Sequence, residues 1–442
     1  MRPHFMEPQA RQDNAMPGIT DHLIRFAQTQ PPRDALAMLR LSLFDWTACG
    51  IAGAQDSAFD GFVAVHHASG GTAEATVLGG GKLPVATAAL INGTLSHALD
   101  YDDTHFAHIG HPSVAVLPAV LAIAERDGLA LSQVIEAATL GIEASIHVGI
   151  WLGRDHYQVG YHQTATAGAF GATLAVARLM KLDADRTRMA LGLCASLASG
   201  LKSQFGTMAK PLNAGLAARA GVEAAVWAQA GMTAAPDGLA GPLGFGPTHH
   251  GEGDEAALAT IGQGVWQIES ISHKFHACCH GLHAMLEALG DTQIDPLVIA
   301  RIDIETHPRW MSVCNIADPD TGLGAKFSYR QTAAMSLLGQ DTGAIASYTE
   351  AITTRSDVIS LRNLINVAEN PDLSEMQSRV KITLKNGDVH ELQHDLNAAI
   401  PADIRASKLR SKAAGLLGQA QADALWVACQ GDDAAALMAQ LV

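Results

Sequence analysis

The stretch TAGAFGATLAVARLMKL, residues 166–182, decides the fold class of this 442-residue chain. Glycine and alanine recur among its leucine and valine residues, and such small side chains let neighbouring helices approach closely. In a water-soluble chain this composition predicts a crowded helical core. The search for further helices therefore works outward from this segment in both directions.

The same Ala/Leu-rich texture runs from about residue 18 to residue 265. The segments PRDALAMLRLSLFDWTACGIAG (32–53) and SQVIEAATLGIEASIHVGIWLG (132–153) have the period of amphipathic helices that pack on two sides. DADRTRMALGLCASLASG (183–200) begins with an acidic turn and ends at a glycine, which is the usual punctuation of a helix. We therefore predict a mainly α fold with a large all-helical domain whose N-terminal part covers 18–265.

The pattern of apolar and polar residues changes after about residue 265. LVIARIDIETH (297–307) alternates apolar and charged residues, as a half-buried strand does. RVKITLKNGDVHEL (379–392) contains two alternating runs joined by Asn386-Gly387, which is the strongest short signal for a hairpin. Because helical stretches such as YRQTAAMSLLG lie between these strands, we predict a smaller α+β lid domain over 266–398.

The last part of the chain is helical again. ASKLRSKAAGLLGQAQADALWVACQ (406–430) predicts that a segment over 399–442 returns to the first domain. The first 17 residues are polar and lack the apolar core of a signal peptide, so we expect a disordered leader. No run approaches eighteen uninterrupted apolar residues, and no membrane span is expected.

The composition and net charge of the chain limit the kinds of partner that it can bind. The chain is 48% hydrophobic and only 17% charged, so it builds a large core or hides surface in an oligomer, and we expect a homodimer. The net charge of −15 argues against nucleic acid or an anionic membrane as a partner. Six cysteines without a CxxC pair fit a reduced, cytoplasmic compartment.

Titratable residues crowd into SHALDYDDTHFAHIGHPSVAVLP, residues 96–118. If residues 92–104 are helical, His97, Asp100 and Thr104 lie at i, i+3 and i+7 and share one face. The turn at His111 leads directly into an apolar helix. This favours a stretch that lines a functional site over a loop that is merely solvated.

A metal site is the alternative interpretation of this stretch. His105, His108 and His111 follow one another at intervals of three, but this spacing does not match the helical HExxH signature. We therefore expect no metal, and we assign Asp102, His105 and His108 to the helix end and the rim.

Three further clusters carry candidate chemistry. GRDHYQVGYHQTATAG (153–168) holds Tyr157 and His162 before a helix rich in small residues. GLKSQFGTMAKPLNAG (200–215) places Lys210 in an apolar part of the chain, where lysine is seldom buried unless it is paired or functional. HKFHACCHGLHAMLEAL (273–289) fits no standard zinc pattern and is interpreted as a turn and helix start that line a cleft.

These clusters, in this order, resemble the MmgE/PrpD family, which includes 2-methylcitrate dehydratase, cis-aconitate decarboxylase and iminodisuccinate epimerase. The resemblance rests on AALINGTLSHALDYDDTH, HPSVAVLPA, YHQTATAGAFGA, FGTMAKPLNAG and HKFHACCHGLH. It covers about residues 18–430. It implies a large helical domain, a smaller α+β lid, an active site between them, a homodimer, and neither a metal nor an organic cofactor.

The resemblance, together with the clusters above, selects the candidate site residues. The catalytic candidates are His111, His162, Lys210 and Tyr157, and the substrate-binding candidates are Asp100, Thr104, Lys274 and Cys279. The chain also departs from the family pattern. Asn213 stands where the KPLH histidine is expected, Gln331 stands at a tyrosine position, and Cys279 stands where the decarboxylase has histidine.

The chemistry shared by the family starts with a proton next to a carboxylate, which is very weakly acidic. An enzyme without a metal must neutralise the carboxylate with cations and supply a base of near-neutral pKa, for which histidine is suited. We expect a cofactor-independent enzyme for a small di- or tricarboxylate, with a preference for an epimerase such as iminodisuccinate epimerase. The alternatives are a lyase of the dehydratase or decarboxylase type, a metal enzyme, and a catalytically silent member.

Overall fold

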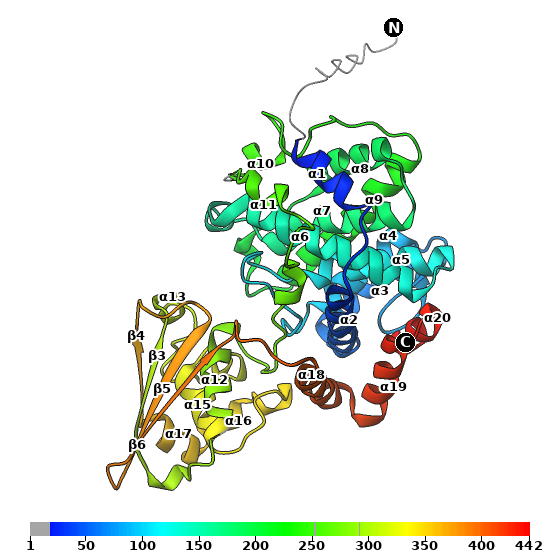
Figure 1. Cartoon of the computed structure of the whole chain (residues 1–442). Helices are drawn as coiled ribbons and strands as arrows, with labels where there is room; N and C mark the ends of the chain where they lie inside the picture. The colour runs from blue at the N-terminus through cyan, green and yellow to red at the C-terminus, as the bar shows by residue number, and fades with distance from the viewer. Residues whose placement is uncertain (1–17, 252, 291) are drawn as a thin grey trace.

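The chain forms a large body of helices and a smaller body built on a four-stranded sheet (Figure 1). The structure is a computed structural model that describes residues 18–251, 253–290 and 292–442. The leader expected over 1–17 lies outside the described residues. The predicted mainly α class agrees with the architecture.

Long helices make up the first body. They are α1 (Ile19–Phe26), α2 (Arg33–Gly53), α3 (Asp60–Ser69), α4 (Val85–Ser96), α5 (Ser113–Asp127), α6 (Leu131–Gln158), α7 (Gln163–Leu179), α8 (Ala184–Leu197) and α9 (Ala209–Gln229), with the short α10 (Phe245–Thr248) and α11 (Glu255–Ala259) and a small hairpin of β1 (Ala75–Thr76) and β2 (Lys82–Leu83).

The opening stretch of the sequence analysis lies largely in α7, which is almost entirely buried. Its small residues permit close packing, because a Cβ added to Gly141 of α6 would lie 2.6 Å from the carbonyl oxygen of Gly171 in α7. A Cβ added to Gly168 would lie 2.7 Å from the Cβ of Ala115 in α5. The prediction of a crowded helical core is confirmed.

The second body contains the strands β3 (Ile299–Thr306), β4 (Ile365–Glu369), β5 (Gln377–Leu384) and β6 (Val389–Asp395) in the order β4-β3-β5-β6. β3 pairs in parallel with β4 and antiparallel with β5, and β5 and β6 form the hairpin predicted at Asn386-Gly387. Its helices are α12 (His283–Gly290), α13 (Pro308–Met311), α14 (Gly322–Ala325), α15 (Tyr329–Leu337), α16 (Glu350–Thr354) and α17 (Ser356–Arg362).

The chain then returns to the helical body through α18 (Ala402–Leu417), α19 (Gln419–Gln430) and α20 (Ala434–Met438) (Figure 1). A buried ion pair joins Lys412 of α18 to Asp45 of α2 at 2.6 Å, and Lys412 also donates to the carbonyl of Tyr101 at 2.6 Å. The C-terminal helices therefore brace the loop that carries the candidate site. The boundaries at 265/266 and 398/399, and the role of the smaller body as a lid, stay predictions.

Two helices, Arg33–Gly53 and Leu131–Gln158, are long and apolar enough to cross a membrane by length and composition alone. The expectation from the sequence that the chain has no membrane span stays a prediction. Within α6, 89% of the most apolar window is buried inside the protein, and within α2 the value is 67%. Core helices pass the same test, so this is weak evidence for a span.

Candidate functional site

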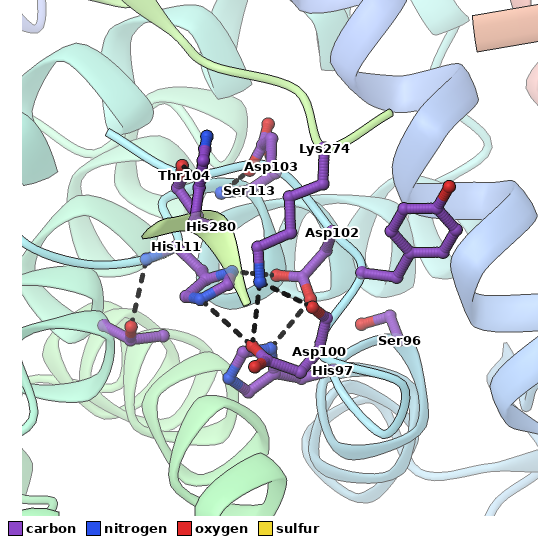
Figure 2. A network of polar contacts seen from close by, with 12 residues as sticks. Ser96, His97, Asp100, Asp102, Asp103, Thr104, His111, Ser113, Lys274 and His280 are labelled. Atoms are coloured by element: carbon purple, nitrogen blue, oxygen red, sulfur yellow. Dashed lines mark hydrogen bonds and ion pairs between the residues drawn. The ribbon is translucent and has the colours of Figure 1, made fainter. Parts of the chain in front are cut away.

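A buried carboxylate bridges two histidines at the centre of the site (Figure 2). The two oxygens of Asp102 lie 2.8 Å from Nδ1 of His97 and 2.8 Å from Nδ1 of His111. The charges of His111 and His97 outweigh the opposing effect of burial and hold the pKa of Asp102 well below its usual range. Because an ionised carboxylate only accepts hydrogen bonds, Nδ1 of His97 carries the proton. The ion-pair distance to the second oxygen favours the same tautomer for His111.

This arrangement leaves the Nε2 atom of each ring with its lone pair. Burial lowers the pKa of His111 to about 4 against the opposing effect of Asp102, so the ring is neutral at pH 7 and keeps a lone pair. Nε2 of His111 faces Asp100 Oδ1 at 3.3 Å. An imidazolium formed at His111 would therefore have a carboxylate on each of its two nitrogens.

The Asp100 carboxylate forms ion pairs with the two lysines of the site. Lys210 Nζ lies 2.6 Å from its Oδ1, and Lys274 Nζ lies 3.4 Å from the same oxygen and donates to the Asp100 carbonyl at 2.6 Å. These lysines overcome the effect of burial and hold the pKa of Asp100 well below its usual range. The Asp100 side chain is nevertheless 44% exposed, whereas that of Lys274 is 3% exposed. Two ammonium groups thus meet at a point that solvent can reach.

The loop between α4 and α5 positions these groups. Asp100 has a left-handed backbone with φ of 50°, which only a few residue types other than glycine adopt readily. Asp103 accepts from the backbone and hydroxyl of Ser113 at 3.3 and 2.5 Å and so ties the loop to the start of α5. Thr104 exchanges backbone hydrogen bonds with Ser272, both at 2.9 Å. Through these contacts, the middle of the loop is fixed to α5 and to the segment before α12.

Thr104 also contacts a histidine from the segment before α12. Its Oγ1 lies 2.8 Å from Nδ1 of His280, and Nε2 of His280 lies 3.2 Å from the hydroxyl of Ser272. Burial, with the nearby charge of Lys274, keeps the pKa of His280 well below its usual range. Thr104 is therefore placed beside the site by two segments that are far apart in sequence.

His162, at the start of α7, has the opposite hydrogen-bond arrangement from His111. The side-chain nitrogen of Asn213 lies 3.4 Å from the carbonyl oxygen of Leu201, so it must be the donor end of the amide. The same nitrogen lies 3.2 Å from Nδ1 of His162, which therefore accepts. Burial, with the charge of His97, holds the pKa of His162 well below its usual range, so the neutral ring carries its proton on Nε2.

The three rings are neighbours. The centroid of His97 lies 4.5 Å from that of His111 and 6.2 Å from that of His162, and the His111 amide donates to Thr164 in the first turn of α7 at 3.0 Å. The predicted residues Asp100, His111, His162, Lys210 and Lys274 are thus brought together. Their catalytic and binding roles stay predictions.

Cys279 lies beside this group on the turn before His280. A hydrogen bond from Cys314 lowers the pKa of Cys279, while burial opposes it and Lys274 adds to the lowering. The backbone amide of Cys279 donates to the carbonyl of Lys326 at 3.0 Å. Cys279 is therefore a half-buried thiol within electrostatic range of Lys274.

Tyr157 lies next to two cations. Lys202 Nζ sits 3.7 Å above its ring centroid and donates to its carbonyl, and the guanidinium of Arg309 lies 5.9 Å from the same centroid. The kink at Gly153 in α6, with φ of 76°, turns this last part of the helix. Its proposed catalytic role stays a prediction, but its surroundings are those of a binding residue.

A metal could find donors here, but not those considered from the sequence. Four possible ligand atoms lie within 4.8 Å of one another, one each from His97, Asp100, Asp102 and His111. Lys210 and Lys274 both approach Asp100, and their ammonium groups would repel a cation at that position. The two ammonium groups therefore disfavour a cation at this position, and the expectation of no metal stays a prediction.

Two expectations about the loop are corrected. Asp102, His105 and His108 are not rim residues, because all three are buried. His105 Nε2 lies 3.1 Å from the Gln267 carbonyl oxygen, and His108 Nε2 lies 3.0 Å from the Ser145 hydroxyl, so these rings are structural.

The condition that residues 92–104 are helical, on which the shared face of His97, Asp100 and Thr104 depended, is not met. Helix α4 ends at Ser96, His97 is its C-cap, and the left-handed turn at Asp100 brings His97 and Asp102 together. Neither His97 nor Asp102 was selected from the sequence as a site residue. Their presence in the same crowded stretch was the only signal that could have found them.

Comparisons with known proteins find one family and several relatives. The MmgE/PrpD N-terminal domain matches residues 18–256, and the MmgE/PrpD C-terminal domain matches residues 276–429. Cis-aconitate decarboxylase of Aspergillus terreus is 30% identical over 308 residues, which cover 65% of this chain and 63% of that protein. Cis-aconitate decarboxylase of Homo sapiens is 27% identical over 330 residues, 69% of this chain and 67% of that protein. The match thus spans less than two thirds of the fungal relative.

Proposed function

The chain belongs to the MmgE/PrpD family, and we propose that it is a cofactor-independent acid/base enzyme acting on a small di- or tricarboxylate. The observation that carries the proposal is the opposite arrangement of His111 and His162 around two lysines. His111 offers a lone pair on Nε2, and His162 offers a proton on Nε2.

In this proposal Lys210 and Lys274 neutralise the carboxylate attached to the reacting carbon. Neutralisation makes the adjacent carbanion character less costly, because charge develops next to fixed cations in a largely buried site. Where the reaction removes the α-proton, as in dehydration or epimerisation, His111 accepts that proton, and Asp102 and Asp100 stabilise the imidazolium that results. In decarboxylation the electron pair comes from the broken C–C bond, and no proton goes to His111. His162 donates its Nε2 proton to the substrate and regains a proton from solvent.

Within this chemistry we favour a lyase over the epimerase that the sequence suggested. The relatives are named cis-aconitate decarboxylases, and the preference for an epimerase gains no support from them. When a carboxylate leaves as CO₂, its electron pair stays with the substrate, and a proton donor must supply a proton to carbon. His162 is suited to supply that proton. Lys210 and Lys274 are suited to stabilise the negative charge that develops on the remaining carboxylates.

Epimerisation is the second candidate, because one basic and one protonated histidine also meet its needs. An epimerase removes a proton from one face of a carbon and delivers a proton to the other face. The homodimer, the cytoplasmic location and the lack of nucleic-acid or membrane partners stay predictions that accompany either candidate.

Proton NMR in heavy water distinguishes the candidates. The purified protein is incubated with cis-aconitate, 2-methylcitrate and iminodisuccinate in turn. A decarboxylase gives CO₂ and a product with a new alkene and one deuterium, a dehydratase gives a vinylic product, and an epimerase gives exchange of the α-hydrogen without an alkene.

The variants His111→Gln and His162→Gln test the site, with His390→Gln on exposed β6 as the control. We expect each site variant to lose about 100-fold in kcat or more, and the control to keep full activity. No turnover of any of the three compounds, or full activity in both site variants, would contradict the proposal.

A further inference from the structure

Three cations lie close to the Glu375 carboxylate or to the Tyr157 ring where the helical body meets the sheet-containing body. We call Arg154, Tyr157, Lys202, Arg309 and Glu375 the Tyr157 cluster. Glu375 bridges Arg309 at 2.6 Å and Arg154 at 3.3 Å, and Trp310 donates to the Glu375 carbonyl at 2.8 Å. In a chain whose net charge is −15, this cluster carries a local excess of positive charge.

Lys202 is the cation without a counter-charge. Its Nζ lies 3.7 Å above the Tyr157 ring centroid and donates to the Tyr157 carbonyl at 2.9 Å, and in the described part of the chain no carboxylate lies within ion-pair distance of it. Partial burial and the charge of Arg309 lower the pKa of Lys202. The two cations therefore repel each other across Tyr157, and a bound anion would relieve that repulsion.

The Tyr157 cluster is adjacent to the histidines described above. The amide of Lys202 donates to the Gly160 carbonyl at 2.8 Å, and the amide of His162 donates to the Gly200 carbonyl at 2.9 Å. These two bonds hold the segment before His162 against the segment that carries Lys202. From the latter segment, the ring of Phe205 lies 5.0 Å from that of His162 and 5.6 Å from Lys210 Nζ.

Cys279 links the two groups from the other side. It lies within electrostatic range of Lys274 and Asp100, and it also contributes to the raised pKa of Tyr157, which burial raises most and Arg309 lowers. Lys210 with Lys274 and Lys202 with Arg309 are thus two pairs of cations, and Cys279 is within electrostatic range of Lys274 in the first pair and of Tyr157 beside the second.

We propose that Lys202, Arg309 and the Tyr157 hydroxyl form a second anion subsite, which binds the carboxylate of the substrate farthest from the reacting carbon. This inference rests on the proposed function, since it assigns the two ends of a polycarboxylate to two pairs of cations. Tyr157 then contributes through binding and orientation of the substrate.

Direct binding tests the subsite without requiring turnover. The probe is tricarballylate, a saturated tricarboxylate, measured by isothermal titration calorimetry, with butyrate as a monocarboxylate followed by NMR titration. Lys202→Met should weaken the binding of tricarballylate by about tenfold, because it removes one charge-assisted contact. It should leave the affinity for butyrate unchanged. Arg410→Met, which breaks an exposed ion pair with Asp423, is the matched control and should change neither affinity.

Glu375→Gln has an expected effect of opposite sign. It removes the carboxylate that, among the described residues, pairs with Arg309 and Arg154, so tricarballylate should bind a few times more tightly while butyrate is unaffected. A general loss of folding could not mimic a gain in affinity. Thermal unfolding of each variant identifies any that is destabilised.

The outcomes separate the subsite from the proposed reaction. Weaker tricarballylate binding in Lys202→Met and tighter binding in Glu375→Gln support the subsite even if no turnover is found. Unchanged affinities in both variants overturn the subsite, even if the wild-type protein is an active lyase. Failure of the wild-type protein to bind tricarballylate at all also overturns it.

Discussion

The side-chain nitrogen of Asn213 lies 3.2 Å from Nδ1 of His162 and thereby determines which nitrogen of that histidine carries the proton. Asn213 was noted from the sequence as a departure from the family pattern, where histidine is expected. In the structure it is a buried donor whose orientation is set by the carbonyl of Leu201. The departure is therefore compatible with an active site.

This relationship predicts different behaviour for Asn213→Asp and Asn213→Ser. An aspartate accepts where asparagine donates, so it would move the proton of His162 to Nδ1 and remove the proton donor at Nε2. We expect kcat to fall about 100-fold at pH 8 in Asn213→Asp and about tenfold in Asn213→Ser. The measurement is kcat against pH for both variants.

The pH profiles provide the decisive contrast. The aspartate raises the pKa of His162, and the imidazolium form again carries a proton on Nε2. Asn213→Asp should therefore recover activity as the pH falls from 8 towards 6, whereas Asn213→Ser should keep the profile of the wild-type protein. Parallel profiles in the two variants would show that Asn213 has only a packing role.

A second prediction concerns the bridging carboxylate. Asp102→Asn removes the charge that holds His97 and His111 in one tautomer, and an amide cannot accept from both rings with equal strength. We expect kcat to fall about 100-fold, measured with the substrate that the NMR panel identifies.

The neighbouring Asp103→Asn is a matched control for Asp102→Asn. Asp103 is equally buried, but its hydrogen bonds go to Ser113. It should change stability and leave kcat close to the wild-type value at a temperature where the variant is folded. Equal loss of kcat in both variants would contradict a special role for Asp102.

Much of the fold could be predicted because the helical and strand periods are local. The segments 32–53 and 132–153 predicted α2 and α6 to within a few residues, except at the end of α6. The strand at 297–307 carried one irregularity, since Ile299 and Ile302 are three residues apart and yet both buried. The structure resolves it with a change of register between Ile299 and Arg301, where β3 pairs with β5.

The site was harder to predict because its geometry depends on contacts between distant segments. His111, His162 and Lys210 were selected through a family resemblance, and the structure brings them together. The bridge from Asp102 to His97 and His111 was missed because it requires the left-handed backbone of Asp100, which alternation and helical spacing do not encode. Lys202 and Arg309 were missed because they are 107 positions apart and meet only where the two bodies touch.

A third prediction tests the expectation of no metal. Exhaustive dialysis against a chelator should leave kcat and KM unchanged, because the two ammonium groups beside Asp100 disfavour a cation among His97, Asp100, Asp102 and His111. Metal analysis of the dialysed protein accompanies the assay. If activity is lost on dialysis and is restored by added Zn²⁺ or Mg²⁺, the result would support the metal-enzyme alternative.

A fourth prediction concerns stability and follows from Asp103. Burial raises the pKa of Asp103 to about 7 from an ordinary value of 3.8, against the hydrogen bond from Ser113. Between these two values the folded protein holds a proton that the unfolded chain has lost. Folding therefore takes up a proton, and this contribution to the free energy of unfolding falls as the pH rises from about 4 to about 7.

Asp103→Asn removes that titration while it keeps one acceptor oxygen for Ser113. The dependence of the unfolding free energy on pH should become less negative between pH 4 and pH 7, by at most ~1.4 kcal/mol per pH unit. Denaturant unfolding at several pH values measures it, with Asp403→Asn, at an exposed position in α18, as the control. Asp45, whose pKa burial raises to about 6 against the effect of Lys412, still titrates in the variant, so a residual slope remains. If the wild-type and Asp103→Asn curves run parallel, Asp103 is ionised in the folded protein and its tie to Ser113 is a bond to a charged carboxylate.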